Sequence, residues 1–205
     1  MSVKIINFFK NTNLKKQQQI AKTLLVLVYA IFTMVIFILP LFSFDNYSIV
    51  SNTTSHLGAQ GSPNAWVMNV VFIVMGLTTI LIVFNNPSPV IILFGVLFGG
   101  SLVLTGIFRH AALIENFESN ILLDQFHSVF ATTTGIGFVA LSSTQGFISK
   151  DKQRTIAFLM AVFATLLSVA MMIKPQYMGI LQRLMFLISF AWIFFYLKNP
   201  NFPPK

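Results

Sequence analysis

Residues 63–108 read PNAWVMNVVFIVMGLTTILIVFNNPSPVIILFGVLFGGSLVLTGIF, two long apolar runs separated by the short polar stretch NNPSP. A helix that crosses the hydrocarbon core of a membrane needs about 20 predominantly apolar residues, and both runs come close to that length. The sequence from Asn85 to Pro89 cannot continue a helix, because it combines two prolines with turn-forming residues. This stretch therefore predicts two transmembrane helices joined by a tight hairpin.

The same apolar pattern recurs over most of the 205 residues. Six segments are suitable as membrane spans, namely residues 23–44, 63–84, 90–108, 126–148, 155–173 and 178–197. We therefore expect an all-α integral membrane protein built as a six-transmembrane-helix bundle. In this interpretation a basic N-terminal segment (residues 1–22) precedes the transmembrane domain (residues 23–197), and a short tail (residues 198–205) follows it.

The composition excludes several other classes of protein. Hydrophobic residues make up 56% of the chain and charged residues only 9%, whereas soluble domains contain about 25% charged residues. A soluble chain of this composition would expose apolar patches large enough to cause aggregation. A soluble enzyme, a nucleic-acid-binding domain and a disordered tail are thus excluded. The absence of cysteine also excludes disulfides, thiolate zinc sites and cysteine nucleophiles.

The positive charges predict the orientation of the six spans in the membrane. Ten cations fall on one side of the predicted bundle: Lys4, Lys10, Lys15, Lys16, Lys22, Lys150, Lys152, Arg154, Lys198 and Lys205. Only Arg109, Lys174 and Arg183 fall on the other side. Because cytoplasmic loops carry an excess of lysine and arginine, we expect both termini to be cytoplasmic. The net charge of +8 is therefore interpreted as a topology signal and not as nucleic-acid affinity.

Most of the other ionisable residues fall on the opposite, outer side. They comprise His56, His110 and His127 together with Asp45, Glu115, Glu118 and Asp124. Each lies in a loop or near the end of a span, which predicts a polar basin at the outer mouth of the bundle. Our leading hypothesis is that this basin is an outward-facing pocket that binds a lipid head group or a small amphiphile. We expect Ser55, Arg109, Glu115 and Arg183 to contact that ligand.

The alternative hypothesis is a metal-dependent membrane hydrolase that acts on lipid-like substrates. Asp124 and His127 are three residues apart, so they share one helical face, and imidazole and carboxylate groups are good zinc ligands. With His56 and His110 they would complete a site in which zinc activates water. A haem held by two histidines between helices is a weaker alternative, because these histidines lie close to the membrane surface. A transporter is a weaker third interpretation, and the sequence leaves open whether the protein is an enzyme.

Other features predict contacts within the bundle. Arg183 lies about one turn into the sixth span, where it either clamps an anionic head group or ties the span to an outer loop through an acid such as Asp124. The glycines Gly95 and Gly99 predict close packing between the third and fourth spans. The apolar spacing in residues 111–121 predicts a short interfacial helix.

Four short motifs resemble a prokaryotic membrane family known as domain of unknown function 998. They are Ser55-His56-Leu57-Gly58-Ala59, Asn64-Ala65-Trp66-Val67-Met68-Asn69, Thr105-Gly106-Ile107-Phe108 and His127-Ser128-Val129-Phe130-Ala131. At the positions of His56 and Arg109, members of that family often have aspartate and proline. The resemblance implies a six-helix membrane protein with no established activity. We expect location in the bacterial cytoplasmic membrane, with membrane lipids as partners. The protein partner is left open between a second copy of this chain and another membrane protein. No nucleic-acid partner is expected.

Overall fold

The computed structural model describes residues 2–197, with side chains from residue 19 onward, and the regular elements in this part of the chain are all helical. The α-helices are α1 (Ser2–Ile38), α2 (Thr54–Leu57), α3 (Ala65–Phe84), α4 (Pro89–Ile107), α5 (Ile121–Ile148), α6 (Asp151–Ile173) and α7 (Met178–Ala191). Three short turns complete it: the 3₁₀ turns η1 (Leu39–Phe42) and η2 (Pro175–Tyr177), and the π-helical turn η3 (Trp192–Tyr196). The predicted tail, residues 198–205, lies outside the described residues.

Five stretches of helix are long and apolar enough to cross a membrane: Gln19–Phe42, Ala65–Phe84, Pro89–Ile107, Asp151–Ile173 and Pro175–Tyr196. These coincide with five of the six predicted spans, and the chain is a multi-pass helical membrane protein. The predicted fourth span corresponds to α5, which has 28 residues but is not among the five. Its polar residues, including a run of three threonines, make α5 less apolar than its neighbours.

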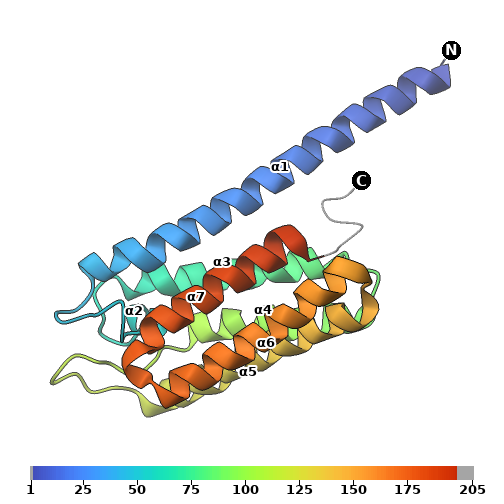
Figure 1. Ribbon diagram of the computed structural model, residues 1–205. Coiled ribbons are helices and arrows are strands. Elements are labelled where there is room, and N and C mark those ends of the chain that lie inside the picture. Colours follow the sequence, from blue (N-terminus) through green and yellow to red (C-terminus); the bar gives the residue numbers. More distant parts are fainter. Residues whose placement is uncertain (1, 198–205) are drawn as a thin grey trace.

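The helices lie side by side, with their connections at the two ends of the bundle (Figure 1). One end holds the α3–α4 and α5–α6 hairpins. The opposite end holds the longer connections, which run through residues 43–64 and 108–120. α1 leans across the bundle and contacts α3 and α7 (Figure 1). It is continuous through residues 22 and 23, so the predicted basic segment and the first span belong to one helix.

The α3–α4 hairpin forms where the sequence predicted it. Ser88 caps α4 by accepting a hydrogen bond from the backbone N–H of Ile91 over 3.5 Å, and Pro89 occupies the first helical position. Proline is favoured at this position because its missing N–H would have no partner there. Asn86 Oδ1 also accepts from the backbone N–H of Ser88 over 3.0 Å. Local sequence alone therefore accounts for this turn.

Small residues bring α3 and α4 into close contact. Gly76 of α3 and Gly99 of α4 face each other, and a Cβ added to Gly99 would lie 2.6 Å from the carbonyl oxygen of Gly76. Gly95 packs in the same way against Val83 of α3. The predicted contact between α4 and α5 is present, but Gly137 of α5 makes it, against the backbone of Phe98. Gly95 and Gly99 of α4 therefore pack against α3 and not against α5. The short α3–α4 hairpin already places α3 alongside α4.

One local prediction for the outer connections was wrong, and one short helix was missed. Residues 109–120 form an irregular loop and no interfacial helix, and α5 begins only at Ile121, with Asn120 as its cap. The loop backbone is held by side chains such as Asp124 and Ser119, which accept hydrogen bonds from Ala111 and Ala112. Conversely, α2 was not predicted. This single helical turn positions His56.

Candidate functional site

The three histidines of the chain come together at the end of the bundle that holds the long connections. His56 lies on α2, His110 follows α4 and His127 lies in the first two turns of α5. The His56 and His110 ring centroids are 5.0 Å apart, and those of His110 and His127 are 5.4 Å apart, both in edge-to-face geometry. Asp124 Oδ1 lies 3.7 Å from His110 Nδ1. These four residues, the histidine cluster, are the ones that the sequence selected.

The hydrogen bonds of His56 define where its proton lies. Asn52 Oδ1 accepts from the backbone N–H of Ser48 over 2.9 Å, so the Asn52 amide nitrogen faces His56 Nδ1 at 3.1 Å and donates to it. A nitrogen that accepts a hydrogen bond carries no proton, which places the proton of the neutral ring on Nε2. Burial, together with smaller effects of His110, His127 and Arg183, lowers the pKa of His56 from 6.5 to about 4. His56 is therefore neutral at pH 7 and presents an N–H donor.

His110 and His127 have the opposite arrangement. His127 Nδ1 lies 2.8 Å from the carbonyl oxygen of Phe108 and 3.1 Å from that of Thr105. His110 Nδ1 lies 2.9 Å from the carbonyl oxygen of Ala111. Since carbonyl oxygens only accept, both Nδ1 atoms carry the proton in the neutral rings, and both Nε2 atoms have free lone pairs. The cluster thus combines one N–H donor with two imidazole acceptors.

This arrangement fits only part of a zinc site. The lone pairs on Nε2 of His110 and His127 are suited to a metal, and a backbone carbonyl on the other ring nitrogen is a common support for such ligands. His56, by contrast, presents a protonated nitrogen, and Asp124 Oδ1 is occupied by the Ala111 N–H over 2.7 Å. Among the residues that the structure describes, no three His, Cys, Asp or Glu side chains form a group that could hold a metal ion.

Arg183 lies apart from the cluster and is fully buried. Its guanidinium donates hydrogen bonds to the carbonyl oxygens of Ile36, Ile49, Asn52 and Gly179 over 2.8 to 3.0 Å, and to the Tyr47 hydroxyl over 2.6 Å. Burial raises the pKa of Tyr47, and the nearby Arg183 charge opposes that rise. No ion pair joins Arg183 to an acid in the described part of the chain. Of the two predicted roles, the structure shows the tie to an outer loop, made through carbonyl groups.

The other residues predicted to contact the ligand are Ser55, Arg109 and Glu115. Ser55 is adjacent to His56 on α2 and is buried. Arg109 and Glu115 are exposed on the loop that follows α4. Within the described residues, no side-chain hydrogen bond or ion pair joins Arg109 or Glu115 to the cluster. Of the three, only Ser55 lines the cavity described below.

Gln60 is a structural residue of this region that the sequence analysis missed. Its amide nitrogen donates to the carbonyl oxygens of Arg109 and Asn120 over 3.3 and 3.0 Å, and its Oε1 accepts from the Asn120 N–H over 2.8 Å. The Gln60 N–H also donates to the carbonyl oxygen of His110 over 2.9 Å. Gln60 therefore fixes the loop that carries His110. A lone glutamine in a loop gives no signal of such long-range contacts.

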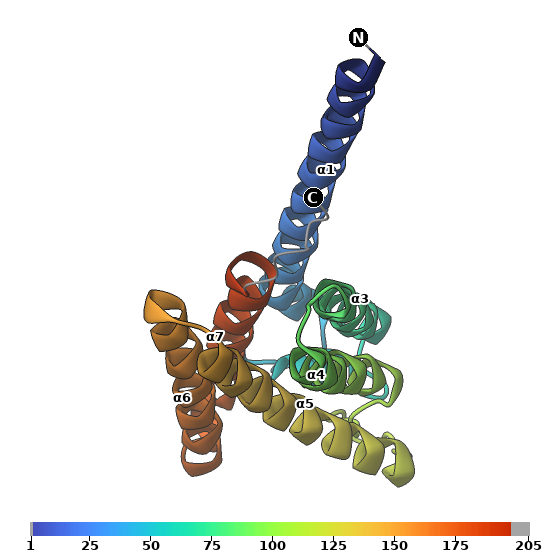
Figure 2. The same ribbon diagram turned by 90° about the vertical axis from the view of Figure 1, so that its right-hand side faces the viewer.

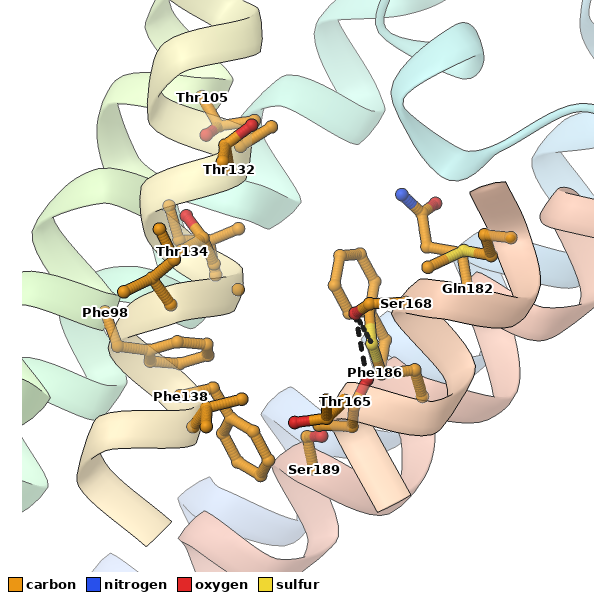
Figure 3. Close-up of a pocket in the computed structure, with 18 of the residues that line it drawn as sticks. Phe98, Thr105, Thr132, Thr134, Phe138, Thr165, Ser168, Gln182, Phe186 and Ser189 are labelled. Atoms are coloured by element: carbon orange, nitrogen blue, oxygen red, sulfur yellow. Dashed lines mark hydrogen bonds between the residues drawn. The ribbon is translucent and has the colours of Figure 1, made fainter. Parts of the chain in front are cut away.

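An apolar cavity of about 780 Å³ lies inside the bundle between α4, α5, α6 and α7 (Figure 3). No cluster residue lines this cavity. Two of its lining residues are neighbours of the cluster: Ser55 precedes His56, and the carbonyl oxygen of Thr105 accepts a hydrogen bond from His127. Thr105 and Gln182 lie at one end and Ser189 at the other (Figure 3). None of its described lining residues is charged.

The arrangement of the helices explains why this cavity exists. α5 and α6 are joined by a short connection at residues 149–150 and diverge from there (Figure 2). Near the connection the gap is closed by aromatic packing such as Phe147 against Phe158. Farther along, small residues on α5, including Ala131 and Gly135, leave the space open.

Comparison with known proteins agrees with the resemblance seen in the sequence. The family model described as a protein of unknown function (DUF998) matches residues 26–197. The chain belongs to this family. No curated protein and no solved structure gives a significant match. The description of the family assigns no activity to its members.

Proposed function

We propose that this DUF998 protein binds the head group of a lipid or another small amphiphile in an outward-facing pocket formed by the histidine cluster. The observation that carries this proposal is that the polar cluster and the apolar cavity are neighbours, with Ser55 and Thr105 lining the cavity and adjoining His56 and His127. An amphiphile has the same division into polar and apolar parts. A cavity of about 780 Å³ is also within the range of about 300–1,000 Å³ common for small-molecule sites.

The proposal includes six membrane spans with both termini in the cytoplasm. α5 packs against both α4 and α6, which are candidate spans, and it lies alongside them in the bundle (Figure 1). Lys150, Lys152 and Arg154 lie at the end of the bundle opposite the cluster. The positive-inside rule places that end in the cytoplasm and the cluster at the outer face. We further propose that the membrane is a bacterial cytoplasmic membrane.

Each part of the pocket has a role in binding. The Nε2–H of His56 donates to a head-group oxygen, and the Nε2 atoms of His110 and His127 accept from hydroxyl or amine groups. Arg109 and Glu115 contact charged groups at the rim. Arg183 takes no direct part, because its donors are already engaged by five oxygens.

Native mass spectrometry of the detergent-purified protein tests the proposal. Asparagine can place its amide N–H where histidine has Nδ1–H, so the double variant His110→Asn, His127→Asn keeps the anchors to the backbone and removes both Nε2 atoms. We expect the parent protein to retain a co-purifying lipid and this double variant to lose it. Thr133→Ala serves as the control, since Thr133 bonds only to its own helix. Equal retention by all three proteins would contradict the proposal.

The alternative hydrolase, with zinc on His56, His110, His127 and Asp124, is tested by elemental analysis of the same samples. Stoichiometric zinc in the parent, lost in the double variant, would favour the hydrolase. The two free imidazole nitrogens are the observation in its favour, and the protonated Nε2 of His56 is the observation against it. A zinc-free parent that retains lipid would favour the binding protein.

A further inference from the structure

The floor of the cavity contains a hydroxyl group that has no partner. Ser189 of α7 lines the cavity and is only 3% exposed, and its Oγ makes no hydrogen bond within the protein. Two other hydroxyls of the wall behave differently: Thr165 and Ser168 donate to carbonyl groups of their own helix. An unsatisfied buried hydroxyl costs about 1–3 kcal/mol. A ligand oxygen at this position would remove that cost.

The cavity is also open at its side. Ile136 of α5 and Met172 of α6 line it, yet they are 61% and 83% exposed. These residues face the hydrocarbon of the bilayer in the proposed topology. An apolar chain can therefore pass between α5 and α6 without crossing water.

The walls restrict the chemistry of the occupant. No described lining residue is charged, so a charged group inside the cavity would lose its hydration without a counter-ion. Two polar groups at opposite ends of the cavity are available to a ligand, the Ser189 hydroxyl and the Gln182 amide nitrogen. Gln182 Oε1 is already engaged by Thr54 over 2.7 and 2.8 Å, and its nitrogen points toward the cavity (Figure 3). The Gln182 nitrogen can only donate and the Ser189 hydroxyl can donate or accept, so an uncharged ligand with acceptor oxygens satisfies both groups.

We infer that the cavity binds a single-chain ester lipid, whose ester carbonyl accepts a hydrogen bond from Ser189 and whose acyl chain leaves between α5 and α6. This inference rests on the proposed function for the position of the head group at the histidine cluster. Seven residues separate Gln182 from Ser189 along α7, which corresponds to about 10 Å at 1.5 Å per residue. The ligand therefore has an extended head group between the cluster and its ester.

The test uses bromine quenching of Trp192, whose ring centroid lies 5.8 Å from that of Phe138 in the cavity wall. The chain has only two tryptophans, and Trp66 is 65% exposed. The variant Trp66→Phe therefore leaves Trp192 as the single reporter. The probes are methyl 9,10-dibromostearate, 9,10-dibromooctadecane without the ester, and the 9,10-dibromostearate anion at pH 8, each added to the protein in detergent.

We expect saturable quenching by the methyl ester. The anion should bind at least tenfold more weakly. Ser189→Ala should weaken binding of the ester about fivefold to tenfold, the value of one hydrogen bond, and leave binding of the alkane unchanged. Ser142→Ala is the matched control, because Ser142 is buried outside the cavity and donates to Phe138.

A second pair of variants tests the cavity itself. A Cβ on Gly135 or on Gly100 would meet nothing within 4 Å, but only Gly135 lines the cavity. Gly135→Leu should abolish saturable quenching and Gly100→Leu should preserve it.

The inference is overturned if Gly135→Leu is quenched like the parent, if Ser189→Ala affects ester and alkane equally, or if the anion binds more tightly than the ester. These probes have no head group, so the His110→Asn, His127→Asn variant should still bind them, even if the proposed function fails.

Discussion

The guanidinium Nη2 of Arg183 donates a hydrogen bond of 2.6 Å to the hydroxyl of Tyr47, which lies 136 residues earlier in the chain. The Tyr47 hydroxyl in turn lies 2.8 Å from the carbonyl oxygen of Thr53, next to α2. Gly179 makes this contact possible, because a Cβ there would overlap the carbonyl oxygens of Ile49 and Asn52. One buried cation thus fixes the loop that leads to His56.

Replacing Arg183 should therefore destabilise the whole protein. Arg183→Met removes five hydrogen bonds and leaves several buried carbonyl groups without a donor, and we expect a loss of about 3 kcal/mol or more in unfolding free energy. Thermal unfolding in detergent measures this loss. Arg109→Met is the control, since Arg109 is exposed. Equal midpoints for the two variants would show that Arg183 does not hold the loop.

Gly99 and Gly100 are adjacent on α4 but differ in surroundings. A Cβ on Gly99 would meet the Gly76 carbonyl and Ile80, whereas a Cβ on Gly100 meets nothing within 4 Å. We expect Gly99→Leu to cost about 2 kcal/mol or more through overpacking, and Gly100→Leu to be neutral or slightly stabilising. Chemical unfolding in mixed micelles compares the two. A larger loss for Gly100→Leu would refute the helix register described here.

Stability should decrease in mild acid because of His56. Its pKa is lowered from 6.5 to about 4 in the folded protein, so below pH 6.5 the unfolded chain binds a proton that the folded chain excludes. The contribution of neutral His56 is therefore present above pH 6.5 and is lost as the pH falls toward 4, by roughly 3 kcal/mol in total. Unfolding midpoints measured from pH 7.5 to 4.5 should fall more steeply for the parent than for His56→Asn. Parallel curves would contradict this assignment.

Gln60 should control the mobility of the loop at residues 109–120. Gln60→Leu removes three side-chain hydrogen bonds to Arg109 and Asn120, so we expect faster hydrogen exchange at the Asn120 amide. Thr133→Ala, which lies outside this network, should leave that exchange rate unchanged. Unchanged exchange in Gln60→Leu would show that the loop is held by other contacts.

Much of the architecture follows from local sequence. The apolar runs and the Asn85–Pro89 turn predict the helices and the α3–α4 hairpin, because length and hydropathy decide whether a segment can cross a membrane. The predicted topology also places His56, His110 and His127 near helix ends on the same side of the bundle. Their convergence was predicted from that shared position.

The details depend on contacts that no short pattern encodes. The five partners of Arg183 come from α1, from the loop before α2 and from α7. They are four carbonyl oxygens and a hydroxyl, which no short pattern reveals. The sequence suggested an acid in their place. The lone proton on His56 Nε2 follows from the orientation of the Asn52 amide. The cavity arises from the divergence of α5 and α6, which hydropathy does not describe.

The central claim is that the histidine cluster opens at the outer face of the membrane, and cysteine labelling tests it most directly. The chain contains no cysteine, so Arg109→Cys and Lys152→Cys each introduce a single thiol at opposite ends of the bundle. Arg109→Cys should react with a membrane-impermeant maleimide on intact cells, and Lys152→Cys should react only after lysis. The reverse pattern would place the cluster in the cytoplasm and contradict the proposed pocket.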